Sequence, residues 1–186
     1  RDQRQIQTSS HQPAEIRGIL FDKDGTLVDF DLTWIPVYFK ALDVFCLDQP
    51  DDDLRQRCLT AAGYDITNNC TIPNSPLAVE GADDIAAIWL QVAGQPNHTD
   101  RIAGLVAIME QAAADSPAPL FDVAALFADL AARDLVLGIA TMDAEWVARR
   151  TLEHLQAAEH VTYYAGYDSG FGRKPGPGMV SRFCDD

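Results

Sequence analysis

Short apolar runs alternate with longer amphipathic stretches along this chain. Three short runs predict strands at residues 16–21, 135–140 and 161–164. The middle run is nearly all apolar, as expected of a strand that is buried on both faces of a sheet. Apolar residues at helical spacing predict helices over 121–132 and 144–156. Alternating strands and helices indicate an α/β fold with a doubly wound parallel sheet.

The segment between the first strand and this α/β unit predicts helices only. Four stretches carry apolar residues three and four positions apart: 33–47, 51–62, 78–92 and 99–114. A loop rich in proline and asparagine is expected at 68–76. We interpret the acidic triplet Asp51–Asp53 as a helix cap rather than a metal site, because carboxylates at a helix start satisfy free N–H groups.

This pattern divides the 186 residues into three parts. Residues 1–15 are polar without an apolar core, which predicts a flexible tail and argues against a signal peptide. Residues 16–30 and 116–186 form the α/β core, and residues 31–115 form a helical insertion. We expect the insertion to cover the carboxyl ends of the strands.

Composition and charge narrow the possible partners. A net charge of −14 repels nucleic acid and anionic membranes, so neither is expected as a partner. No apolar run approaches the roughly 18–20 residues of a membrane span. The cysteines form no C-x-x-C pair, which argues against zinc and for reduced thiols in a cytoplasmic protein. The sequence does not determine an oligomeric state.

Polar residues follow the predicted strands at the ends where ligands bind in open parallel sheets. Asp22 and Asp24 follow the first strand and precede a Gly-Thr turn. Thr141 follows the second strand, and Lys174 lies in the glycine- and proline-rich loop after the third. Carboxylates, a hydroxyl with nearby N–H donors and a cation suit phosphoryl transfer, in which positioning and charge stabilisation dominate.

Each of these features also has a purely structural interpretation. An Asp-Gly pair forms turns, Thr141 could cap the helix that follows it, and Lys174 could be an ordinary surface lysine. The loop 170–178 fits neither G-x-x-x-x-G-K-[ST] nor G-x-G-x-x-G, so no nucleotide loop is predicted. The second acid at a buried strand tip favours chemistry over a simple turn.

Three segments in this order resemble the motifs of the haloacid dehalogenase (HAD) superfamily. Phe21–Asp29 resembles its motif I, Gly138–Thr141 its motif II and Gly172–Pro175 its motif III. The place of the helical insertion resembles the C1 cap subclass. The stretch from Gly166 to Val180 is similar to phosphoglycolate phosphatase-like members. The resemblance implies a HAD-like α/β core with an α-helical C1-type cap.

The resemblance implies roles for the two aspartates. Asp22 would attack phosphorus and form an aspartyl phosphate. Asp24 would protonate the leaving oxygen and then activate water. Asp22 and Asp24 would also hold Mg²⁺, a hard cation that prefers oxygen ligands. The dehalogenases of the superfamily lack the second acid and its phosphorylating ATPases carry Thr there, so Asp24 favours a phosphohydrolase or phosphomutase.

The resemblance also implies a phosphate-binding set. Lys23, Thr141, Met142 through its N–H, and Lys174 would contact or balance the phosphoryl group. The expected function is a magnesium-dependent phosphatase for a small phosphorylated metabolite, with phosphoglycolate favoured. A sugar phosphomutase and an impaired binding or regulatory protein remain alternatives.

One expected element is missing after Gly178. The acidic motif IV of the family, which follows a fourth strand, does not occur in residues 179–186. Without that strand the first strand would be an apolar edge strand, which is an aggregation hazard. We therefore expect the sequence to be part of a longer chain that has about two further strand–helix units.

Overall fold

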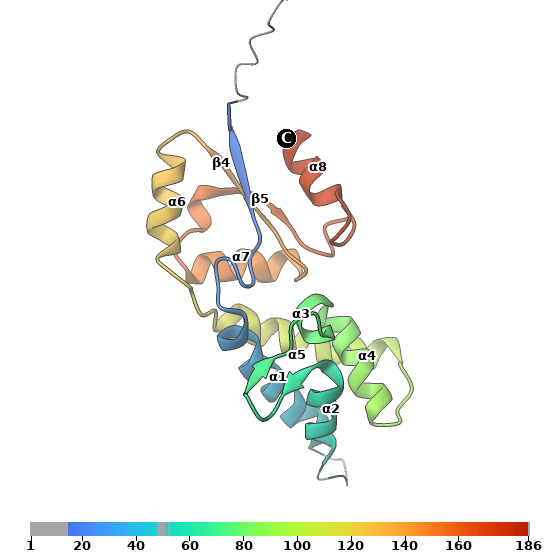
Figure 1. Cartoon of the computed structure of the whole chain (residues 1–186). Coiled ribbons are helices and arrows are strands. Elements are labelled where there is room, and N and C mark those ends of the chain that lie inside the picture. The colour runs from blue at the N-terminus through green and yellow to red at the C-terminus, as the bar shows by residue number, and fades with distance from the viewer. Residues whose placement is uncertain (1–14, 48–50, 52, 186) are drawn as a thin grey trace, which may run out of the picture.

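The computed structural model describes residues 15–47, 51 and 53–185, and it contains an α/β part and a group of helices beside it (Figure 1). The α/β part consists of the strands β1 (Gly18–Phe21), β4 (Val136–Ala140) and β5 (Val161–Ala165), the helices α6 (Val123–Ala131), α7 (Glu145–His154) and α8 (Gly178–Asp185), and the short 3₁₀ helix η1 (Ala158–His160). The tail predicted for residues 1–15 lies outside the described residues, apart from Glu15.

The three strands form a parallel sheet in the order β1–β4–β5. Phe21 pairs with Ile139, and Ala140 pairs with Ala165, so the three strands end at the same edge of the sheet. The predicted α/β fold with a parallel sheet is confirmed. Within the described residues β1 pairs with β4 alone, which makes it the edge strand that the sequence led us to expect.

Alternate strand residues pack against helices on opposite faces of the sheet. On one face the strand residues share a hydrophobic cluster with Phe127 of α6 and Leu152 of α7; these strand residues are Ile19, Phe21, Leu137, Ile139, Val161 and Tyr164. On the other face α8 supplies Met179 and Phe183. Helices on both faces bury the sheet, which explains the apolar runs in the sequence.

Gly138 allows α8 to approach the sheet closely. A Cβ atom at this position would lie 2.8 Å from the Phe183 ring and 2.9 Å from Leu20. Both distances are below ordinary carbon contacts, so any side chain here would push α8 away from the strands.

The helical part has its own core. It contains α1 (Phe30–Cys46), α2 (Leu54–Ala62), α3 (Pro76–Val79), α4 (Ala82–Val92) and α5 (Thr99–Asp115). Their buried side chains include Leu42, Ile85, Trp89 and Met109. None of the helices in the described ranges has the length and apolar character needed to cross a membrane. The domain boundaries at 30/31 and 115/116 stay predictions.

Two details of the helical part differ from the sequence-based expectation. The segment is not all helical, because β2 (Tyr64–Asp65) and β3 (Cys70–Thr71) form a small antiparallel hairpin. The single helix expected over 78–92 is divided into α3 and α4, since Glu80 and Gly81 are extended. Pro76 begins α3 and Gly81 is the N-cap residue of α4.

The acidic triplet acts as a cap only in part. Asp53 is the N-cap residue of α2, but its side chain makes no capping hydrogen bond. Asp51 instead accepts from the Asp53 N–H at 3.1 Å and pairs with Arg57. Asp52 lies outside the described residues.

Candidate active site

Asp22 lies at the tip of β1, where three segments of the chain meet. Lys174 Nζ donates to Asp22 Oδ1 at 2.6 Å and to the Ala140 carbonyl oxygen at 2.8 Å. The Lys23 N–H also donates to Asp22 Oδ1, at 2.8 Å. The Asp22 side chain remains 49% exposed, so a ligand can reach the carboxylate. The structure thus brings Asp22 and Lys174 together as the sequence predicted.

A tight turn places Asp24 beside this strand tip. The Lys23 carbonyl accepts from the N–H groups of Leu27 at 2.8 Å and Val28 at 3.2 Å. Leu27 and Val28 are fully buried and anchor the turn in the core. Gly25 has a φ of 73°, a left-handed conformation that glycine adopts without steric cost. The Gly-Thr pair of the sequence motif therefore fixes the position of the second acid.

Lys23 lies beneath the site, paired with two carboxylates. Its Nζ is 2.7 Å from Asp24 Oδ1 and 2.7 Å from Asp143 Oδ2, and its side chain is 1% exposed. Burial favours loss of the proton, but the charges of Asp143 and Asp24 outweigh burial and raise the pKa of Lys23 above its ordinary value. A buried, doubly paired ammonium is not available to a phosphate. This placement argues against the phosphate-binding role expected for Lys23.

Asp143 is a site residue for which the sequence predicted no role. Burial and the charge of Asp24 raise the pKa of Asp143 to about 7, while Lys23 opposes the rise. Its only sequence signal was its position two residues after Thr141, at the end of a strand. Lys23 thus joins the turn after β1 to the turn after β4.

Three aromatic side chains of α1, Phe30, Trp34 and Tyr38, lie beside the site on the side away from the sheet, and we call them the ladder. Trp34 Nε1–H donates to Asp24 Oδ1 at 2.7 Å. The Trp34 ring stacks on Phe30 at 6.5 Å and on Tyr38 at 5.5 Å between ring centres. Burial, Asp143 and Asp24 raise the pKa of Tyr38, so its hydroxyl keeps its proton. Trp34 therefore combines core packing with a polar contact to the second acid.

Thr141 and Met142 occupy the turn after β4. Thr141 is 1% exposed, and its Oγ1 accepts from the Asp143 N–H at 3.2 Å. It does not cap the following helix, because the N-cap residue of α7 is Ala144. Met142 lies beside the ligand space described next. A phosphate contact by Thr141 or by the Met142 N–H stays a prediction.

A cavity of about 230 Å³ lies between the strand ends and the helical part. We call its α/β side the floor, formed by Asp22, Asp24, Met142, Asp143 and Lys174. We call its other side the roof, formed by Phe30, Trp34, Tyr38 and residues 77–82. The volume suits a phosphate group with a small attached group, below the usual size of drug-binding pockets.

Polar contacts hold the helical part over the strand ends. Arg173, next to Lys174, pairs with Asp83 at 2.6 Å and with Asp84 at 3.4 Å. Glu110 of α5 accepts from Tyr167 Oη at 3.0 Å and from Trp146 Nε1 at 3.2 Å. These contacts therefore connect α4 and α5 to α7 and to the loop that carries Lys174.

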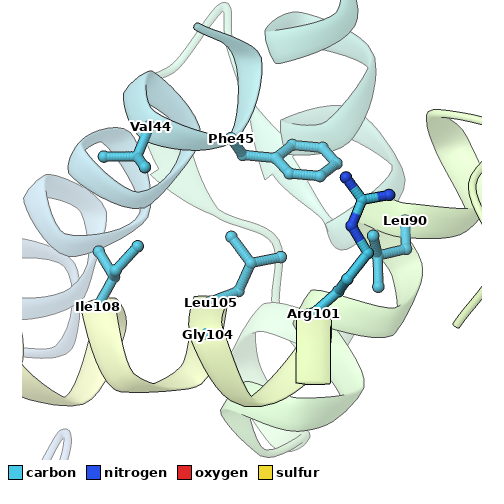
Figure 2. A pocket seen from close by; sticks show the side chains of 7 residues that line it. All are labelled: Val44, Phe45, Leu90, Arg101, Gly104, Leu105 and Ile108. Atoms are coloured by element: carbon cyan, nitrogen blue, oxygen red, sulfur yellow. The ribbon is translucent and has the colours of Figure 1, made fainter. Parts of the chain in front are cut away.

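A second cavity, of about 330 Å³, lies within the helical part (Figure 2). It is lined by Val44, Phe45, Leu90, Arg101, Gly104, Leu105 and Ile108. It contains neither carboxylates nor any of the predicted site residues, so the cavity at the strand ends is the candidate active site.

The oxygen donors at the floor are of the type that Mg²⁺ prefers. In the part of the chain that the structure describes, Asp22 accepts from the Lys23 N–H and from Lys174 through Oδ1, and its carboxylate can still offer an oxygen lone pair to a cation. Mg²⁺ commonly takes one or two carboxylates and keeps several waters. In residues 15–47, 51 and 53–185, no group of three or more His, Cys, Asp or Glu side chains is arranged to hold a metal ion. A site that uses few protein ligands fits this donor set.

Comparison with known proteins agrees with this arrangement. Residues 19–186 match the sequence model of a family described as haloacid dehalogenase-like hydrolase. No curated protein sequence matches the chain.

Solved structures share the fold at low sequence identity. A predicted phosphoglycolate phosphatase from Haemophilus somnus is 18% identical, with a TM-score of 0.64 over 94% of this chain and 72% of that one. CbbY from Rhodobacter sphaeroides, as a mutant in complex with xylulose-(1,5)bisphosphate, is 18% identical, with a TM-score of 0.62 over 92% of this chain and 73% of that one. At this identity the likeness shows the fold.

Proposed function

The chain belongs to the haloacid dehalogenase-like hydrolase family, and we propose that it is a magnesium-dependent phosphatase for a small phosphorylated metabolite. One observation carries the proposal. An exposed carboxylate, Asp22, is held by Lys174 at 2.6 Å at a strand tip, and a second acid, Asp24, is held two residues away. The family resemblance implies phosphoryl transfer through an aspartyl phosphate, and this geometry fits that reaction.

In the proposed reaction Asp22 Oδ2 attacks phosphorus, and the alcohol leaves. Lys174 and the Lys23 N–H hold Oδ1, which leaves the other oxygen for the attack. The bond to the alcohol breaks as the aspartyl phosphate forms. Lys174 offsets the negative charge that accumulates between Asp22 and the phosphoryl group.

Asp24 moves the proton in both half-reactions. It gives its proton to the leaving alcohol oxygen and later takes one from the water that hydrolyses the aspartyl phosphate. Lys23 and Trp34 donate to its Oδ1, so they fix the carboxyl beneath the roof. Asp22 and the Asp24 carbonyl would hold Mg²⁺, which would neutralise phosphate charge when bound.

Phosphoglycolate, which the sequence favours, is one ester to test. A cytoplasmic location, inferred from unpaired cysteines, also stays a prediction; all four cysteines are free in the structure.

The proposal is tested by phosphate release from p-nitrophenyl phosphate with Mg²⁺. Asp22→Asn removes the nucleophile, so we expect the rate to fall by at least about a thousandfold. Asp129→Asn is the matched control, because Asp129 is exposed on α6 and pairs only with Arg133 in the described contacts. Equal activity of Asp22→Asn and wild type would refute the assignment.

A further inference from the structure

The roof contributes apolar surface and one acidic side chain to the cavity. Phe30, Trp34 and Tyr38 present aromatic rings, and Leu77, Ala78, Val79, Gly81 and Ala82 add aliphatic or backbone surface. The charged roof residue is Glu80, which is exposed at the end of α3. Among the described residues that line the cavity, the roof provides no lysine, arginine or histidine.

The cations of the floor are already engaged. Lys174 is held by Asp22 and the Ala140 carbonyl, and Lys23, directly beneath the floor, is buried between two carboxylates. In the proposed reaction Lys174 is committed to Asp22 and the phosphoryl group. A second anionic group on the substrate would therefore find no free cation on the floor.

Arg173, a further cation beside the roof, is also neutralised. Its guanidinium pairs with Asp83 and Asp84 and lies over the Tyr167 ring at 5.1 Å. Gly81 forms part of the roof, and a Cβ atom added to Gly81 would lie 3.6 Å from Arg173 Nη1. We call Glu80, Asp83, Asp84 and Arg173 the rim. Three carboxylates and one guanidinium give the rim a net charge of −2.

We propose that the cavity selects phosphate monoesters whose leaving group is uncharged and has an apolar face, and that the rim discriminates against a second anionic group. This inference rests on the proposed phosphatase function and refines its substrate class. It places phosphoglycolate, whose leaving group carries a carboxylate, among the poor substrates.

Two physical effects support this selection. A carboxylate that enters the cavity loses water beside like charges and receives no counter-ion in return. An apolar leaving group instead covers the half-buried Phe30 and the exposed Val79 of the roof, and burial of apolar area is favourable. Trp34 donates to Asp24, so the ladder lies beside the acid that would protonate the leaving oxygen.

The first experiment compares esters that differ only in charge. Phosphoglycolate and 2-phosphoglycolamide form one pair, and 2-(4-carboxyphenyl)ethyl phosphate and 2-(4-carbamoylphenyl)ethyl phosphate form the other. We expect kcat/KM to be at least about tenfold higher for the uncharged member of each pair. This ratio should become smaller as the salt concentration rises, because salt screens the charges of the rim. Equal or faster hydrolysis of the anionic members would overturn the inference while leaving a phosphatase. No hydrolysis of any ester, p-nitrophenyl phosphate included, would refute the proposed function instead.

The second experiment reverses the charge of the roof. Glu80→Lys should narrow the preference for 2-phosphoglycolamide over phosphoglycolate by about fivefold or more, mainly through a lower KM for phosphoglycolate. Glu159→Lys is the matched control, because Glu159 is 80% exposed and precedes β5, at the opposite end of the strand from the site. An unchanged preference in Glu80→Lys would contradict the role of the rim.

Discussion

The floor and the roof of one cavity differ in almost every physical respect. The floor is dense in charge: the carboxylates of Asp22, Asp24 and Asp143 are each within 2.7 Å of a lysine nitrogen. The roof is aromatic and aliphatic, and its charged side chain is the carboxylate of Glu80. The floor is built on strand ends and a tight turn, whereas the roof comes from helices and the extended link Glu80–Gly81. This contrast suggests that the floor sets the reaction and the roof selects the ester.

After loss of the nucleophile itself, the largest effect should come from removing Lys174, the cation of the floor. Lys174→Met takes away the donor to Asp22 Oδ1 and to the Ala140 carbonyl, so we expect kcat/KM to fall by about a hundredfold to a thousandfold. Steady-state kinetics with p-nitrophenyl phosphate measures this. Lys40→Met, at an exposed position of α1, is the control. Activity within about twofold of wild type in Lys174→Met would show that the floor does not depend on this charge.

Removing the buried lysine should damage stability as well as activity. Lys23→Met leaves the carboxylates of Asp24 and Asp143 facing each other without a counter-charge, so the free energy of unfolding should fall by about 3 kcal/mol. Urea unfolding at neutral pH measures the loss. Adding Asp143→Asn to Lys23→Met should recover part of it. If Asp143→Asn lowers the free energy of unfolding of Lys23→Met by as much as it lowers that of wild type, the two residues are not coupled.

The polar contact between roof and floor should have a smaller effect, and one that depends on the ester. Trp34→Phe keeps the ring but removes the donor to Asp24 Oδ1, so kcat should fall about tenfold for alkyl phosphates. The fall should be smaller for p-nitrophenyl phosphate, because its leaving group needs little protonation. Trp146→Phe, which removes a donor to Glu110, is the control. An equal loss with both esters would mean that Trp34 does not act through protonation of the leaving oxygen by Asp24.

The smallest effect concerns the contact between α5 and the α/β part. Burial raises the pKa of Glu110, against the opposing hydrogen bonds from Tyr167 and Trp146. A raised pKa means that the folded protein binds this proton more tightly than the unfolded chain. The resulting stability is therefore present below the ordinary pKa of about 4.3 and lost as the pH rises through the folded-state pKa.

Glu110→Gln removes this proton-binding group while keeping an oxygen acceptor. Wild type should therefore lose stability relative to Glu110→Gln between about pH 4 and about pH 7. Urea unfolding of both proteins across this range measures the difference. Two curves that stay parallel would show that Glu110 titrates as an ordinary exposed carboxyl.

The sequence predicted the floor better than the roof. Each strand of the parallel sheet was visible as an apolar run, although β1 begins at Gly18 rather than Ile16. Strand ends of a parallel sheet meet at one edge, so the proximity of Asp22 and Lys174 followed from topology alone. Local capping explains the earlier start of α1 at Phe30, because the Asp29 side chain accepts from the Leu32 N–H at 2.8 Å.

What the sequence missed depends on contacts between distant residues. The burial of Lys23 requires Asp143, which is 120 positions away, and nothing local marks that pair. The hairpin Tyr64–Thr71 has strands of two residues each, too short to show alternation. The break between α3 and α4 was visible only as Gly81, which also suits a helix interior at modest cost. The part of the roof formed by residues 77–82 therefore had no reliable local signal.

The central claim, that Asp22 is the nucleophile, is tested most directly by trapping the covalent intermediate. The protein is mixed with an excess of p-nitrophenyl phosphate and Mg²⁺, quenched with acid, reduced with borohydride and analysed by peptide mass spectrometry. Reduction of an aspartyl phosphate gives homoserine, and we predict homoserine at position 22, with none in Asp22→Asn. Phosphate release without modification of Asp22, or homoserine at another aspartate, would contradict the account.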